Sequence, residues 1–155
     1  MPGSGIDAPA ATIVIRPIDS IPQLHQVEPL QKEVWGCGDL EVSPASLLIA
    51  VREVGGVIVG AFDNRDLVGF AYGFLGRKEG RLGIHSDMLA VKPVYSRLGI
   101  GYRLKLAQRE HALAQGVTTI TWTFDPLQGV NAYFNLRKLG AIAREYKIDF
   151  YGEAG

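Results

Sequence analysis

Residues 89–102 read Leu-Ala-Val-Lys-Pro-Val-Tyr-Ser-Arg-Leu-Gly-Ile-Gly-Tyr, and this stretch decides the fold of the chain. An apolar strand ends at Pro93, and two glycines, Gly99 and Gly101, then open a strongly helical segment. Glycines let the backbone approach a ligand closely, and the first N–H groups of a helix have no acceptor within it. Those free donors and the positive end of the helix dipole attract phosphate oxygens. The stretch therefore predicts an anion-binding loop.

Spacing separates this loop from two common phosphate-binding motifs. A dinucleotide-binding G-x-G-x-x-G requires a third glycine at position 104, where this chain has Leu104. A Walker loop closes with Gly-Lys-Ser or Gly-Lys-Thr, and neither follows here. Both motifs are excluded.

Length and composition indicate one soluble domain. The chain has 155 residues and is 47% hydrophobic, which is enough for a full core. Residues 1–11 are rich in Gly, Pro, Ala and Ser, so we expect a flexible N-terminus followed by a single domain over 12–155. Sixteen basic and sixteen acidic residues cancel, and this balance argues against a nucleic-acid partner.

The cysteine, the histidines and the apolar runs narrow further the class of protein to which this chain can belong. Cys37 is the only cysteine, and the three histidines lack metal-ligand spacing, so we expect neither an intramolecular disulfide nor a metal site. No apolar run approaches the roughly 18 residues of a membrane span. The N-terminus lacks the basic and apolar regions of a signal peptide, and a cytoplasmic protein without a membrane partner is expected.

Hydrophobic periodicity and turn residues predict six strands and four helices. The strands are expected at residues 12–18, 57–62, 67–75, 81–91, 118–124 and 143–150. The helices are expected after Ser20, after Ser43, at 101–115 and at 130–139. A crossover helix joins the strands at 81–91 and 118–124, which must be parallel, whereas the hairpin at 57–75 is antiparallel. The fold class is therefore α/β with a mixed sheet.

These features together resemble the GNAT superfamily of acyl-CoA-dependent N-acyltransferases, whose loop reads R/Q-x-x-G-x-G/A. Gly99 and Gly101 match its glycines, whereas the leading position holds Ser96, with Arg97 beside it. Residues 131–141, Asn-Ala-Tyr-Phe-Asn-Leu-Arg-Lys-Leu-Gly-Ala, resemble the family's second signature, a short helix that ends in a Lys-Leu-Gly turn. The resemblance covers roughly residues 12–150. Within the superfamily, this sequence is similar to an uncharacterised branch of predicted acetyltransferases.

The resemblance implies a GNAT fold (α+β by some schemes), with a mostly antiparallel sheet of about six strands around a central parallel unit. Acetyl-CoA or another short-chain acyl-CoA would be the cosubstrate, and its pantetheine arm would enter where the strands ending at Val91 and Phe124 splay apart. Asn131 would contact the cosubstrate or cap its helix, and Arg97 would pair with a phosphate or remain solvated. The residues implied to bind the cosubstrate are Leu89, Ala90, Val91, Arg97, Leu98, Gly99, Ile100, Gly101, Tyr102 and Asn131.

Acyl transfer to an amine requires a base and a polarised thioester carbonyl. In some relatives the base lies four or six residues before the valine at the strand end, which here gives Asp87 and His85. Even spacing on a strand places both on one face. The alternative is that both make structural hydrogen bonds at a bulge.

Three further residues are candidates for the site. Many relatives carry a tyrosine acid at the position of Leu136, and Tyr133, one turn earlier, is either a shifted acid or a packing residue. Trp35 lies in the loop that borders the acceptor pocket in this fold, or packs in the core. Asp125 follows a strand end where ligands gather, or is a turn residue. We expect Trp35 and Asp125 to bind substrate.

The expected activity is transfer of acetyl, or another short acyl group such as succinyl, to a small primary amine, with amino acids among the candidates. The alternative is a catalytically silent acyl-CoA-binding or regulatory module of the same fold. Relatives usually have a seventh strand, whereas this chain ends just after the sixth. The edge at 143–150, with Ile148 and Phe150, is then uncovered, so a homodimer is expected.

Overall fold

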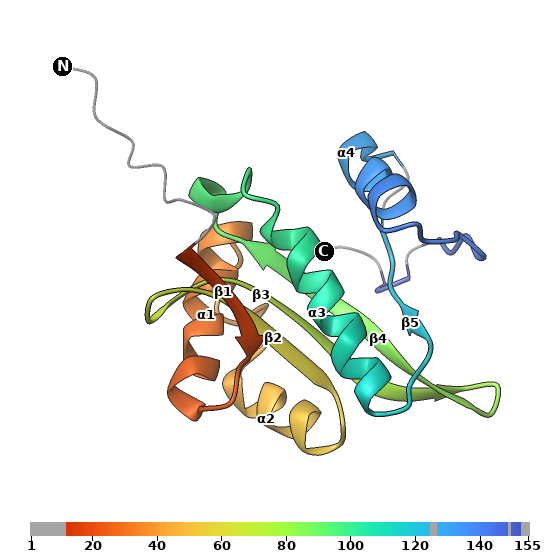
Figure 1. Cartoon of the computed structure of the whole chain (residues 1–155), viewed down its shortest axis with the longest axis horizontal. Helices are drawn as coiled ribbons and strands as arrows, with labels where there is room; N and C mark the ends of the chain where they lie inside the picture. The colour runs from red at the N-terminus through yellow and green to blue at the C-terminus, as the bar shows by residue number, and fades with distance from the viewer. Residues whose placement is uncertain (1–11, 125–126, 149, 153–155) are drawn as a thin grey trace. The chain divides into compact units, whose positions relative to one another are not determined.

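A computed structural model describes residues 12–124, 127–148 and 150–152, and these form two compact units divided between Trp122 and Thr123 (Figure 1). The expected flexible segment at 1–11 lies outside the described residues. None of the described helices is long and apolar enough to cross a membrane.

The first unit is built on a five-stranded sheet in the order β1-β2-β3-β4-β5. The first four strands pair antiparallel, and β4 pairs parallel with β5, which confirms the mixed sheet. The strands are β1 (Ile13–Pro17), β2 (Val57–Asp63), β3 (Asp66–Lys78), β4 (Arg81–Val91) and β5 (Ile120–Thr121).

Three α-helices accompany this sheet, and their ends follow local sequence signals. α1 (Ile21–Trp35) starts at Ser20, whose side chain accepts a hydrogen bond from the backbone N–H of Gln23. α2 (Ala45–Glu53) follows Pro44, and α3 (Ile100–Ala114) follows the glycine loop. A 3₁₀ turn, η2 (Pro93–Tyr95), connects β4 to that loop.

Both faces of the sheet are covered, because β2 and β3 carry apolar residues on both sides. One core joins the sheet to α1 and α2, and its fully buried members include Leu24, Leu48 and Phe70. The other core joins the opposite face to α3 and includes Ile84 and Leu104. The parallel unit β4-α3-β5 is thus anchored by α3 on one face of the sheet (Figure 1).

A bulge interrupts β4 near its middle. Tyr72 pairs with Met88 and Gly73 pairs with Ser86, so Asp87 is the extra residue. The insertion exchanges the two faces of β4. Ile84 points into the α3 core before the bulge, and Leu89 does so after it.

The second unit contains α4 (Gly129–Ala132) and a π-helical segment, η3 (Tyr133–Lys138), where the sequence predicted one helix. The predicted strand at 143–150 is wrong for its described residues, which form no strand. A strand needs a partner ladder, and β5 extends for only two residues instead of reaching Phe124. Tyr146 and Ile148 remain about four-fifths exposed, so the alternating pattern finds no core.

Candidate active site

The glycine loop forms an open helix N-terminus. Gly99 is the N-cap of α3 with φ 69° and ψ 18°, a left-handed conformation that favours glycine, and no side chain caps the helix. The first bond into the helix runs from the Arg103 N–H to the Gly99 carbonyl, at 3.2 Å. The N–H groups of Ile100, Gly101 and Tyr102 precede that bond, so they are free to bind an anion. This end therefore fits a phosphate group.

The surrounding contacts hold the loop in place before any ligand binds. The Lys92 N–H donates to the Val68 carbonyl at 2.8 Å, which extends the sheet ladder into the loop. The Tyr95 hydroxyl donates to Asp63 at 2.8 Å, and this bond, together with burial, raises the pKa of Tyr95. Ile100 is 1% exposed and fixes the start of α3 in the core. Arg97, by contrast, is exposed.

The strands β4 and β5 separate immediately beyond two paired positions. Ile84 pairs with Ile120 and His85 pairs with Thr121. β4 then continues to Val91, and along this stretch the described residues supply no strand partner on its outer side. Leu89, Ala90 and Val91 lie on this stretch. Its outer backbone groups are therefore available to polar groups of a ligand.

Asp87 is held on the bulge by the neighbouring strand. The Tyr72 hydroxyl donates a hydrogen bond to Asp87 Oδ2 at 2.6 Å, and Tyr72 is 2% exposed. Ser43 Oγ lies 3.4 Å from the same hydroxyl, and because the Tyr72 proton is used on Asp87, Ser43 is the group that can donate in this pair. The structural role considered for Asp87 is thus present. A carboxylate with one oxygen held in this way is also well oriented for proton transfer.

His85 lies on the same face of β4 as Asp87. Its ring packs against Phe74 with centroids 5.4 Å apart, and Phe74 and Tyr72 are two residues apart on β3. Its Nδ1 lies 3.1 Å from Thr121 Oγ1. Burial lowers the pKa of His85, and the nearby Lys105 lowers it further, whereas Asp87 opposes the shift. The imidazole is therefore neutral near pH 7 and can accept a proton.

The connection between α1 and α2 is tied to this face through Gln31, a residue that the sequence analysis did not single out. Gln31 is fully buried, donates to the Ser43 carbonyl and accepts from the Ser43 N–H, both at 2.9 Å. This pair places Ser43 beside Tyr72. A glutamine on the apolar stripe of Val27 and Leu30 is the signal that could have revealed it.

The other predicted residues are distributed between the two units. Trp35 packs edge-on against Phe70 with centroids 6.2 Å apart and stays 45% exposed, so it both touches the core and presents a surface. Tyr133 and Asn131 belong to the second unit, where Tyr133 is 58% exposed. Asp125 lies outside the described residues. No group of three or more His, Cys, Asp or Glu side chains in the described part of the chain could hold a metal ion.

Solved structures with this fold include several acetyltransferases. An aminoglycoside acetyltransferase from an uncultured soil metagenomic sample, in complex with sisomicin, superposes with a TM-score of 0.77 and 17% identity, covering 94% of this chain and 98% of its own. A transcriptional regulator from Bacillus halodurans C-125 gives 0.70 and 18%, covering 88% and 97%. The aminoglycoside N-acetyltransferase AAC(6')-Iy in complex with CoA gives 0.68 and 17%, covering 88% and 91%. At these identities the likeness shows the fold.

Sequence comparison identifies the family. No curated protein sequence matches the chain significantly. The profile of the acetyltransferase (GNAT) family matches residues 21–141, which include the bulged strand, the glycine loop and the short helix of the second unit. That match spans well over half of the chain and includes the glycine loop before α3. The chain belongs to the acetyltransferase (GNAT) family, and it is an N-acyltransferase that uses an acyl-CoA.

Proposed function

We propose that the protein transfers an acetyl or another short acyl group from CoA to a small primary amine, with amino acids among its acceptors. The observation that carries this proposal is the uncapped N-terminus of α3 at Gly99, which η2 connects to the bulged strand carrying His85 and Asp87. The phosphates of acyl-CoA would bind the free N–H groups of Ile100 to Tyr102. The pantetheine arm would follow the free outer side of β4.

The reaction requires one proton to leave the amine and one bond to break. The amine nitrogen attacks the thioester carbonyl, the C–N bond forms, the C–S bond breaks, and CoA leaves as a thiolate. His85 or Asp87 accepts the amine proton, directly or through water. Backbone N–H groups of β4 beyond the bulge would polarise the carbonyl. Tyr133 would protonate the thiolate in place of the usual tyrosine, since Leu136 occupies that position.

The acceptor would approach from the face covered by the α1–α2 connection. Trp35 offers a partly exposed aromatic surface there, and we assign Asp125 to the same task of binding the amine. One structural neighbour is an aminoglycoside acetyltransferase in complex with sisomicin, so aminoglycosides belong in the acceptor panel.

We further propose one acyltransferase domain over 12–155 in a cytoplasmic protein. The family match crosses the division at residue 122, which supports a single functional domain. We also propose a homodimer. The described residues of 143–150 do not form the strand edge that suggested this dimer, and light scattering over a dilution series tests it.

The alternative is a catalytically silent acyl-CoA-binding module, favoured by Leu136 at the acid position. Free-thiol release from acetyl-CoA, measured over a panel of amines, distinguishes the two. An enzyme releases thiol at a rate that depends on one class of amine, and His85→Gln or Asp87→Asn slows this rate by a factor of about 10²–10⁴. Binding of CoA without amine-dependent release would support the silent module.

A further inference from the structure

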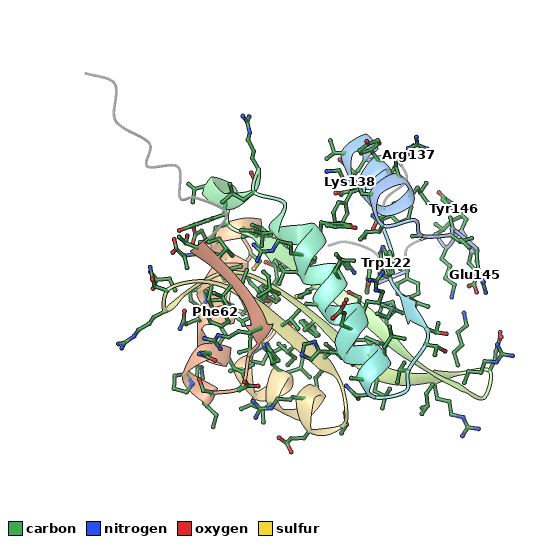
Figure 2. The ribbon with its side chains drawn as sticks, in the orientation of Figure 1. Phe62, Trp122, Arg137, Lys138, Glu145 and Tyr146 are labelled. Carbon is green, nitrogen blue, oxygen red and sulfur yellow. The ribbon has the colours of Figure 1, made fainter. Side chains whose placement is uncertain are left out.

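Lys105 of α3 lies next to both β4 and the residue that follows β5. The Lys105 ammonium donates a hydrogen bond to Ser86 Oγ at 2.6 Å and lies 4.4 Å from the centroid of the Trp122 ring. Ser86 is the first residue of β4 after its last pairing with β5, and Trp122 is the first residue after β5 ends (Figure 2). Lys105 therefore sits where the two strands begin to diverge.

This ammonium is short of anionic partners. Among the described residues its only hydrogen-bond acceptor is Ser86 Oγ, and no carboxylate forms an ion pair with it. Burial lowers its pKa to about 8, so it is still mostly charged at pH 7. Buried charges in proteins are normally paired, because an unpaired one loses its hydration without compensation. The position of the Lys105 ammonium therefore favours the binding of an anion.

The donors at this point match one carboxylate group. Lys105 uses one of its three N–H groups on Ser86, and the Ser86 hydroxyl can still donate its own proton. Together they offer two ammonium donors and one hydroxyl donor. Trp122 covers the ammonium with an apolar ring, which reduces competition from water. The methyl group of an acetyl thioester at this point would leave these donors without an acceptor.

The position of Lys105 and Ser86 relative to the loop indicates which anion would reach them. The proposed phosphate-binding N–H groups lie at the start of α3, and Ser86, which accepts a hydrogen bond from Lys105, precedes the strand end at Val91 by five residues, about 16 Å along β4. A ligand anchored by its phosphates at that end and running between the strands presents its opposite end, the acyl group, toward the start of the gap.

We propose that Lys105, with Ser86, binds a carboxylate at the far end of the acyl group, so that the enzyme prefers acyl-CoA thioesters of dicarboxylic acids, such as succinyl-CoA, over acetyl-CoA. This inference rests on the proposed function. One charge-assisted contact of this kind corresponds to a preference of about 10–100-fold.

The test compares the affinities of succinyl-CoA and acetyl-CoA by titration calorimetry. The proteins are the wild type, Lys105→Met, Ser86→Ala and a control, Arg109→Met, which removes a positive charge from an exposed position of the same helix. We expect the wild type and the control to bind succinyl-CoA about 10–100-fold more tightly than acetyl-CoA. In Lys105→Met the preference should fall below about threefold, with acetyl-CoA affinity retained, and Ser86→Ala should fall between.

Equal affinities in the wild type, or a preference that survives in Lys105→Met, would overturn the proposal. If Lys105→Met does not fold, by circular dichroism, Ser86→Ala and the wild-type comparison still decide the question. Acetyl-CoA binding and amine-dependent thiol release without a succinyl preference would remove this inference alone. Failure of both thioesters to bind would remove the proposed function and this inference together.

Discussion

Replacement of Gly99 by valine tests whether the loop backbone binds CoA. Gly99 adopts φ 69°, and a Cβ placed there would meet nothing within 4 Å, so any effect arises from the backbone conformation and not from a clash. The left-handed region costs an L-residue roughly 1–2 kcal/mol, and a β-branched residue is a clear outlier there. A loop that relaxes out of this conformation must regain it to bind CoA. We therefore expect the Kd for CoA to rise by about 5–30-fold.

The matched control is Gly99→Asn, because asparagine tolerates this conformation. Its Kd, measured by the same calorimetric titration of CoA, should rise less than about threefold. Circular dichroism checks that both variants fold. Wild-type affinity in Gly99→Val would refute the assignment of the phosphate site. An equal loss in both variants would show that side-chain bulk matters, against the open space seen around Gly99.

Three further predictions concern polar groups of the site and of the core. Tyr72→Phe removes the bond to Asp87 and should lower kcat/KM about tenfold with an unchanged Kd for acetyl-CoA; unchanged kcat/KM would make Asp87 purely structural. The acid limb of the kcat/KM profile should lie below pH 6.5, since neutral His85 is the active form, and Lys105→Met should move it to higher pH by removing a nearby positive charge; a limb that stays in place would exclude His85 as the titrating base. The amide of Gln108 is fully buried with no partner among the described residues, so Gln108→Met should raise the free energy of unfolding in urea by about 1 kcal/mol, and a decrease would mean that the amide is paired in solution.

The parts of the fold that depend on local signals were predictable from the sequence. Ser20 marks the start of α1, and the glycines at 99 and 101 mark the start of α3, because caps and left-handed positions restrict the residues that fit them. The even spacing of His85 and Asp87 likewise predicted their common face. Each of these inferences uses residues close together in the chain.

The parts that depend on distant pairing were not predictable. The hydrogen bond from Tyr72 to Asp87 requires the register of β3 against β4 and a bulge at one position, which no local pattern specifies. The sequence alone indicates that Lys105 is a solvated helix residue. Its contact with Ser86, where β4 and β5 diverge, appears only in the structure. The alternation at 143–150 predicted a strand, but a strand forms only where a ladder partner is available.

A crystal structure of the complex with CoA tests the assembly of the site most directly. We expect the CoA phosphates within hydrogen-bond distance of the N–H groups of Ile100, Gly101 and Tyr102. We also expect the pantetheine arm along β4 beyond Ser86, with the sulfur on the side of the bulge at Asp87. Phosphates bound away from the start of α3, or an arm that does not enter between β4 and Trp122, would contradict this arrangement.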